Sequence, residues 1–149
     1  MSGDSFETSK KRSDEIRADL AVNPGKYCML TGDRPTGRLH LGHYFGTIRE
    51  RVALQNLGIT TRIVIADYQV ITDRDTTANI QDNVHNMVID YLACGIDPEK
   101  TIIFTHSAVP AINQLMLPFL SLDTESELMR NPTVKAEQEA SGHALTGLL

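Results

Sequence analysis

The sequence has no excess of positive charge and no long hydrophobic run, and each of these features excludes a class of protein. It has 14 lysines and arginines against 19 aspartates and glutamates, which gives a formal net charge of −5. No overall basic field is therefore available to attract nucleic acid. No apolar stretch is as long as the roughly 18 residues that a membrane-spanning helix needs, and the N-terminus lacks the apolar core of a signal peptide. We therefore expect a cytoplasmic protein without membrane contact.

Cysteine is scarce as well. The only two, Cys28 and Cys94, lie in apolar segments and do not form a C-x-x-C pair. This arrangement predicts reduced, buried thiols. The 149 residues, of which 41% are hydrophobic and 22% charged, are typical of a globular protein and suffice for one domain with a hydrophobic core.

Apolar and amphipathic segments alternate along the chain. Short apolar runs predict buried strands at 27–30, 62–67 and 101–105. Helical patterns of apolar residues lie at 9–20, 39–55, 80–92 and 111–120, the last interrupted at Pro118, and a short amphipathic turn is predicted at 125–130. Successive βαβ units of this kind predict an α/β fold with a parallel sheet. Ligands of such sheets bind outside the carboxyl ends of the strands.

The stretch TGDRPTGRLHLGHYFG, residues 31–46, directly follows the first predicted strand. The simplest interpretation is a tight glycine-rich turn with surface histidines. A phosphate loop of the type G-x-x-x-x-G-K-[ST] is a second interpretation, because Gly32 and Gly37 have that spacing. Arg38 and Leu39, however, stand where the lysine and the magnesium-binding hydroxyl are needed, which disfavours it.

Two histidines in this stretch allow further interpretations. A metal site formed by His40 and His43 lacks an evident third ligand. The segment His40-Leu41-Gly42-His43 also resembles the H-x-G-H signature of class I aminoacyl-tRNA synthetases, which begins the first helix of a Rossmann-like nucleotide-binding fold. A helix N-terminus favours phosphate, and two imidazoles one turn apart can both face an α-phosphate. Gly42 has no Cβ, so adenine can lie against the backbone there.

The surrounding residues narrow the resemblance. The stretch LTGDRPTGRLHLGHYFG is similar to the first loop of tryptophanyl-tRNA synthetases, which reads close to S/T-G-x-x-P-[ST]-G-x-[LI]-x-[LI]-G-[NH]-Y. The stretches IADYQVIT, at 65–72, and YLACGIDPEKTIIFTHSAVP, at 91–110, resemble the same family, as does the terminal GLL. The resemblance implies that 27–149 is the N-terminal part of a catalytic domain whose fold is cut at its C-terminal side. Residues 1–26 would be an N-terminal extension with a short helix. Tyrosyl-tRNA synthetases share H-x-G-H but usually lack this first-loop pattern, and they are the second interpretation.

Roles for individual residues follow from the resemblance. The implied catalytic residues are His40 and His43. The implied ATP-binding residues are Gly32, Asp33, Arg34, His40, Gly42 and His43, and the implied amino-acid-binding residues are Leu30, Asp67 and Gln69. Several family members have glutamine where Arg34 stands, but a guanidinium can bind phosphate with two hydrogen bonds. For Asp67, at the end of a predicted strand, capping a turn is the alternative. Protein metal ligands are not predicted, and Mg2+ is expected only together with ATP.

The remaining histidines and one apolar segment carry weaker expectations. His85 is expected to be solvated, and His106 is expected to be structural or interfacial. The apolar segment 112–122 is predicted to be core or, by the resemblance, part of a homodimer interface.

The implied activity is ATP-dependent activation of L-tryptophan and its transfer to tRNA(Trp), by a homodimer. The sequence contains no K-M-S-K-S-type lysine loop and no anticodon-binding helical domain. The 149 residues alone are therefore expected to be inactive. The alternative from a different class of protein is a non-catalytic fragment that binds a nucleotide or a partner.

Overall fold

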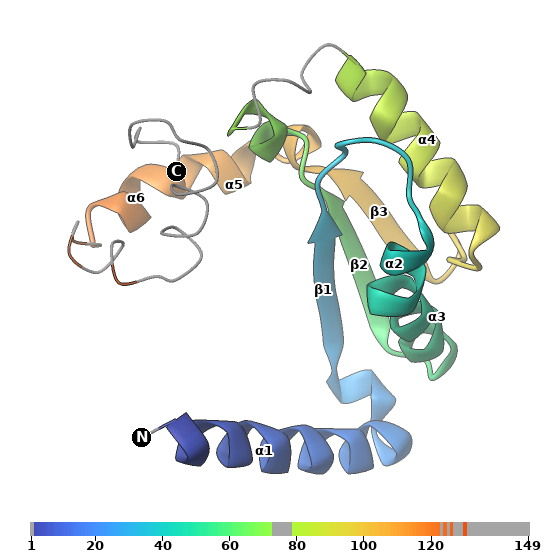
Figure 1. Ribbon diagram of the computed structural model, residues 1–149, viewed down its shortest axis with the longest axis vertical. Helices are drawn as coiled ribbons and strands as arrows, with labels where there is room; N and C mark the ends of the chain where they lie inside the picture. Colours follow the sequence, from blue (N-terminus) through green and yellow to red (C-terminus); the bar gives the residue numbers. More distant parts are fainter. Residues whose placement is uncertain (1, 73–78, 123, 125, 127–129, 131–149) are drawn as a thin grey trace.

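The computed structural model describes residues 2–72, 79–122, 124, 126 and 130 (Figure 1). The main helices and strands are α1 Ser2–Val22, β1 Cys28–Asp33, α2 Leu41–His43, α3 Arg49–Asn56, β2 Thr60–Ile65, α4 Ile80–Ala93, β3 Thr101–Thr105, α5 Pro110–Gln114 and α6 Met116–Leu120. The shorter helical turns are η1 Pro24–Lys26, η2 Tyr44–Ile48, η3 Tyr68–Thr72 and η5 His106–Ala108.

The three predicted strands form one sheet in the order β1-β2-β3, and both neighbouring pairs are parallel. This confirms the predicted α/β class. β3 has the predicted bounds, β1 extends beyond its apolar run as far as Asp33, and β2 begins two residues earlier than predicted. Parallel pairing brings the carboxyl ends of all three strands to one edge, from which the loop to α2 departs.

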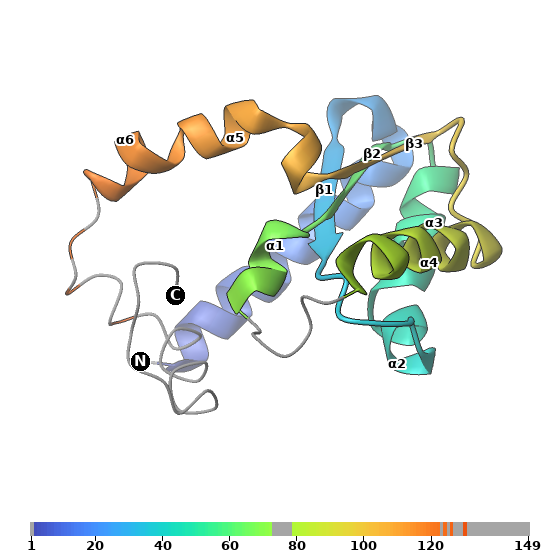
Figure 2. The same ribbon diagram turned by 90° about the horizontal axis from the view of Figure 1, so that it is seen from above.

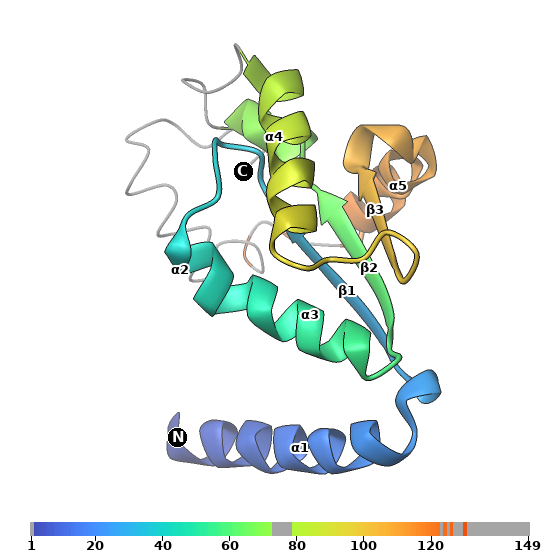
Figure 3. The ribbon, with the colours of Figure 1, turned by 90° about the vertical axis from the view of Figure 1, so that its right-hand side faces the viewer.

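Helices α3 and α4 cover one face of the sheet (Figure 3). Six buried residues form the core between them and the sheet: Ile48, Ile63, Ile65, Met87, Tyr91 and Ile96. The predicted apolar stripe of α4 supplies Met87 and Tyr91 to this core, and Val84 and Val88 pack against it. Alternate residues of β2 point into the core, because successive side chains of a strand point to opposite faces.

The expectation that the strands are buried is wrong for the other face of the sheet. Leu30 is 67% exposed and Ile102 is 56% exposed. Arg62 and Cys28 are exposed on the same face, where the Arg62 Nη1 donates to Cys28 Sγ at 2.7 Å. Apolar composition alone does not tell whether one face or both are covered, and the described helices α3 and α4 cover only one. The thiol of Cys28 is therefore exposed rather than buried, while Cys94 is half-buried.

Helix α1 is longer than the predicted helix at 9–20 and lies beyond the end of the sheet where β1 begins (Figure 1). The turn that follows it is held by the carboxylate of Asp19. This group accepts hydrogen bonds from Asn23, Lys26 and Tyr27.

The predicted helix at 39–55 is continuous but begins at Leu41 and contains a π-helical turn, η2, between α2 and α3. In η2 the backbone N–H of Arg49 donates to the carbonyl of Tyr44. The inward side of this helix is not formed by apolar residues alone. Ile48 is buried, but Arg51 and Gln55 are buried as well, with exposures of 3% and 2%.

Helices α5 and α6 extend away from the sheet (Figure 2). The break between them falls at Leu115 rather than at the predicted Pro118. Pro118 lies in the first turn of α6, where its missing N–H would have no helical partner in any case. The large apolar side chains of this segment are exposed, so the prediction that they form core is wrong: Ile112, Leu115, Met116, Leu117, Phe119 and Leu122. The predicted turn at 125–130 and the segment 134–149 lie outside the described residues, apart from single positions. None of the described helices has the length and apolar character needed to span a membrane.

Candidate active site

The loop between β1 and α2 is fixed to helix α4. Pro35 is fully buried, and its carbonyl accepts a hydrogen bond of 3.1 Å from Asn83 Nδ2. The backbone N–H of Leu39 donates to Asp90 Oδ2 at 3.2 Å. Asn83 and Asp90 lie two turns apart on α4, so the helix holds the loop at both ends. The place where the chain enters α2 is therefore determined by the fold.

His40 and His43 form a reciprocal cap at the start of α2. His40 is the N-cap residue, and its Nδ1 accepts the N–H of Gly42 at 3.1 Å. The N–H of His40 donates to Nδ1 of His43 at 3.3 Å. The ring centroids are 4.0 Å apart and the planes are tilted by 52°. His40 is exposed and His43 is half-buried, so both rings are accessible from solvent.

This cap determines what the two rings can do chemically. A neutral imidazole carries its proton on one nitrogen only, and in each ring Nδ1 is an acceptor. The proton is therefore assigned to Nε2 in both rings. Two Nε2–H donors beside the N-terminal end of a helix form an arrangement suited to binding an anion.

Gly42 is sterically tied to the same cap. A Cβ atom built at this residue would lie 2.8 Å from Cε1 and 3.0 Å from Nδ1 of His40. The sequence-based argument for glycine here was space for adenine. The structure gives a second reason, which is that the His40 ring already occupies the space of a side chain.

Gly32 has a role in the sheet. It lies in β1 opposite Val64 of β2, and a Cβ atom there would lie 2.5 Å from both the carbonyl oxygen and the Cγ1 of Val64. The backbone contact cannot be relieved by rotating a side chain. Glycine at this position is therefore required by the pairing of β1 with β2, and its predicted role in binding ATP remains a prediction.

We expect Gly32→Ala to destabilise the full-length protein by about 1–3 kcal/mol, because the added methyl group must push β1 away from β2. Denaturant unfolding would measure this. Gly25→Ala is the matched control, since a Cβ at Gly25 meets no atom within 4 Å. Equal stability of Gly32→Ala and the wild type would contradict the steric argument.

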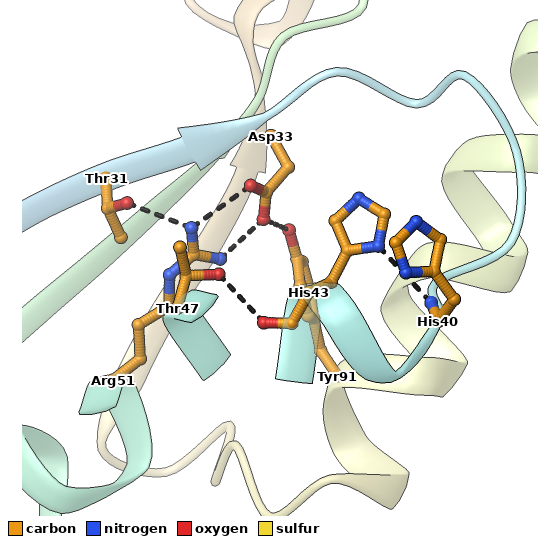
Figure 4. A network of polar contacts seen from close by, with 7 residues as sticks. All are labelled: Thr31, Asp33, His40, His43, Thr47, Arg51 and Tyr91. Atoms are coloured by element: carbon orange, nitrogen blue, oxygen red, sulfur yellow. Dashed lines mark hydrogen bonds and ion pairs between the residues drawn. The ribbon is translucent and has the colours of Figure 1, made fainter. Parts of the chain in front are cut away.

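A partly buried polar network lies beside the histidines (Figure 4). Arg51 of α3 donates from Nη1 to Asp33 Oδ2 at 2.5 Å and from Nη2 to Asp33 Oδ1 at 3.2 Å. The same Nη2 donates to Thr31 Oγ1 at 3.0 Å. The hydroxyl of Tyr91 donates to Asp33 Oδ2 at 2.5 Å. One carboxylate at the end of β1 thus joins the strand to both helices of the covered face.

The charges in this network stabilise each other. Burial raises the pKa of Asp33, but the hydrogen bonds from Arg51 and Tyr91 and the positive charge of Arg51 together hold this pKa below its ordinary value. Burial lowers the pKa of Arg51, but the hydrogen bond to Asp33 and the negative charge of that carboxylate together raise it above its ordinary value. Burial and the bond to Asp33 both raise the pKa of Tyr91. The network therefore consists of a carboxylate, a guanidinium and a neutral phenol at neutral pH.

A second group of predicted residues lies where β2 and β3 end. Asp67 Oδ1 accepts the backbone N–H of Ser107 at 3.0 Å, so this carboxylate does cap a turn. The side-chain amide of Gln69 lies 3.1 Å from Nδ1 of His106. A cavity of about 590 Å3 is bounded by Asp67, Thr105, Ser107 and the neighbouring face of α4. Asp67 and Gln69 thus lie at the sheet edge where ligands of such folds bind.

The structure brings the other predicted residues only partly together. Leu30 lies on the uncovered face of β1, and Arg34 is exposed just after the strand. Asp33 directs its carboxylate into the buried network. His85 is exposed, as predicted. Sequence reasoning did not find Arg51 or Tyr91. The available signal was weak: His43, Thr47 and Arg51 recur at intervals of four in the predicted helix, which places them on one side of it.

Comparisons with known proteins identify the family of the chain. The family model of class I tRNA synthetases (W and Y) matches residues 23–148. A tryptophan–tRNA ligase of Clostridium longisporum is 49% identical over 114 residues, which are 75% of this chain and 33% of the relative. A tryptophan–tRNA ligase of Streptococcus mutans is 44% identical over 129 residues, which are 83% of this chain and 38% of the relative. The match thus spans between 33% and 38% of the length of these relatives.

Solved structures show the same relationship. The crystal structure of tryptophanyl-tRNA synthetase from Campylobacter jejuni matches with a TM-score of 0.70 and 27% identity, over 81% of this chain and 37% of that one. The structure of the same enzyme complexed with ADP and tryptophan matches with a TM-score of 0.65 and 28% identity, over 80% of this chain and 37% of that one. The predicted resemblance and the Rossmann-like fold are confirmed. The chain belongs to the family of class I tRNA synthetases that comprises the tryptophan and tyrosine enzymes.

Proposed function

We propose that the full-length protein is a tryptophan–tRNA ligase and that this chain supplies its nucleotide-binding part. The observation that carries the proposal is the pair of imidazoles at the start of α2, each with Nδ1 occupied by a backbone N–H and Nε2 available as a donor. The relatives named above as tryptophan–tRNA ligases, and the related structure with ADP and tryptophan, support the assignment of substrates.

In this mechanism the carboxylate of L-tryptophan attacks the α-phosphorus of ATP. The bond from the carboxylate oxygen to phosphorus forms, the bond from phosphorus to the pyrophosphate oxygen breaks, and the products are tryptophanyl-adenylate and pyrophosphate. Negative charge builds on the α-phosphate oxygens during attack. The Nε2–H groups of His40 and His43 would stabilise this charge, because donors fixed in advance need no reorganisation when the charge appears.

The other residues would divide between the two substrates. Gly32, Arg34 and Gly42 would border ATP, and Asp33 would do so through the backbone that follows β1. Leu30, Asp67 and Gln69 would border tryptophan. Among the described residues there is no group of three or more metal-ligating side chains. Mg2+ would be bound together with the phosphates of ATP, as the resemblance implies.

The proposal extends to the tRNA, to assembly and to location. The adenylate would react with tRNA(Trp), and the protein would act in the cytoplasm as a homodimer. The exposed apolar side chains of α5 and α6, such as Leu117 and Phe119, are 74% and 59% exposed. Exposed apolar side chains on neighbouring helical turns are compatible with a contact between two copies.

Exchange of pyrophosphate into ATP by the full-length protein tests the function. We expect exchange that depends on tryptophan and is at least about a thousandfold less efficient with tyrosine, because such sites can discriminate strongly between amino acids. Exchange with tyrosine alone would replace the proposal with the tyrosyl enzyme. Binding of ATP without exchange for either amino acid would establish the non-catalytic alternative.

A further inference from the structure

The guanidinium of Arg51 is almost completely buried, although burying an ion pair adds little to the stability of a protein. Its side chain is 3% exposed, whereas that of its partner Asp33 is 17% exposed. Within the described part of the chain, Arg51 Nε has no hydrogen-bond partner. Removing two charges from water offsets much of their attraction, and apolar residues of similar size are often as stable. A gain in stability therefore does not explain why the Arg51–Asp33 pair is buried here. The relative placement of helix and strand that the pair imposes does explain it.

The pair fixes one helix relative to the end of one strand. The Arg51 guanidinium lies between Thr31 and Asp33, and the Tyr91 hydroxyl approaches the Asp33 carboxylate from α4 (Figure 4). These contacts join β1, α3 and α4. Because a guanidinium is a planar fork, its bonds to both carboxylate oxygens fix an orientation as well as a distance.

The same helix carries His43. His43, Thr47 and Arg51 follow one another at intervals of four residues along the continuous helix of α2, η2 and α3. The hydroxyl of Thr47 donates to the carbonyl of His43 at 3.2 Å. Side chains reach about 5–6 Å from a helix axis, so a rotation of about 10° moves an imidazole by about 1 Å. A displacement of that size can slow a reaction about a hundredfold.

We propose that Arg51 is a positioning residue for adenylate formation. Held by Thr31 and Asp33, it sets the rotation of the helix and so the direction in which the His43 imidazole points. This inference rests on the proposed function, because it assigns Arg51 a part in the same step.

Arg51→Met in the full-length protein tests it. We expect kcat of tryptophan-dependent pyrophosphate exchange to fall about 10- to 100-fold. The KM values for tryptophan and ATP should stay within about threefold, because the Arg51 side chain is only 3% exposed and so lies out of reach of a bound substrate. Because this variant leaves Asp33 buried without its partner, the double variant Asp33→Leu with Arg51→Met is measured beside it. We expect the double variant to regain most of the lost thermal stability and little of the lost kcat.

Gln55→Met is the matched control. Gln55 is equally buried, one turn further along α3, and its Oε1 accepts from Thr101 Oγ1 at 2.7 Å and from the N–H of Asp97 at 2.9 Å. This substitution should lower the melting temperature as Arg51→Met does, with kcat within about threefold of wild type.

Three outcomes would count against the proposal, and they can be told apart. Recovery of kcat together with stability in the double variant would show that Arg51 acts through stability alone. An equal loss of kcat in Gln55→Met would show the same. Absence of exchange in the wild-type protein would overturn the proposed function and the role of Arg51 with it.

Discussion

Replacing His43 with alanine is expected to slow tryptophan-dependent pyrophosphate exchange about 100- to 1,000-fold while leaving the dissociation constant of tryptophan within about threefold. The imidazole would act on charge that appears only during attack, so its loss raises the barrier without weakening the ground-state complex. Steady-state exchange kinetics give the rate, and equilibrium binding of tryptophan gives the affinity.

His43→Asn is the informative comparison. An asparagine amide can accept the N–H of His40 with its oxygen and donate from its nitrogen, and the family's first-loop pattern allows asparagine at this position. We expect this variant to keep a rate within about tenfold of wild type. If His43→Ala lowered tryptophan affinity as much as the rate, the ring would be a binding residue rather than a transition-state residue.

Gly42→Val should have the second large effect, a loss of at least about a hundredfold in kcat/KM for ATP with the fold preserved. The Cβ atom, 2.8 Å from Cε1 of His40, forces that ring out of its cap, and a branched side chain also fills the space proposed for adenine. Loss of an N-cap destabilises a protein by only about 0.5–2 kcal/mol. The circular dichroism spectrum should therefore remain that of the wild type.

Gly46→Ala separates the effect of position from that of glycine itself. Gly46 lies in η2, four residues further along, and an added Cβ meets no atom within 4 Å. We expect unchanged exchange kinetics and a gain of about 0.5–1 kcal/mol in stability, because alanine loses less backbone entropy in a helix. Unchanged ATP kinetics in Gly42→Val would show that neither the His40 ring nor adenine needs this space.

The parts of the fold that sequence reasoning predicted are those set by local pattern. The apolar runs placed three strands, and the glycine-rich segment between strand and helix placed His40 and His43 at the carboxyl edge of the sheet, where sheets of this kind bind ligands. His40 is indeed the N-cap of the helix. Capping involves only residues close in sequence, and such local features are the ones that a sequence can reveal.

The parts that it missed depend on partners far along the chain. Arg51 and Asp33 are 18 residues apart, and Tyr91 and Asp33 are 58 apart. In a sequence Arg51 resembles any charged surface residue, and only the tertiary arrangement supplies the carboxylate that permits its burial. The exposure of Leu30 was missed for a related reason, since an apolar strand reads the same with one face covered or two.

The π-helical turn η2 has a consequence for the permitted length of this segment. Each residue of an α-helix turns the chain by about 100°, so one residue inserted or deleted would rotate everything that follows by that angle. Here the wider turn, closed by the Arg49 N–H on the Tyr44 carbonyl, takes up one additional residue locally. The histidine cap before it and the buried side chain of Ile48 at its end can thus each keep their own orientation. Deleting one residue from the turn itself would therefore remove the bulge and leave a regular α-helix in which His43 and Ile48 keep their orientations. A change of one residue in the regular helix α3 has no such compensation, so the turn η2 is the place in this segment where the number of residues can change by one at the least cost.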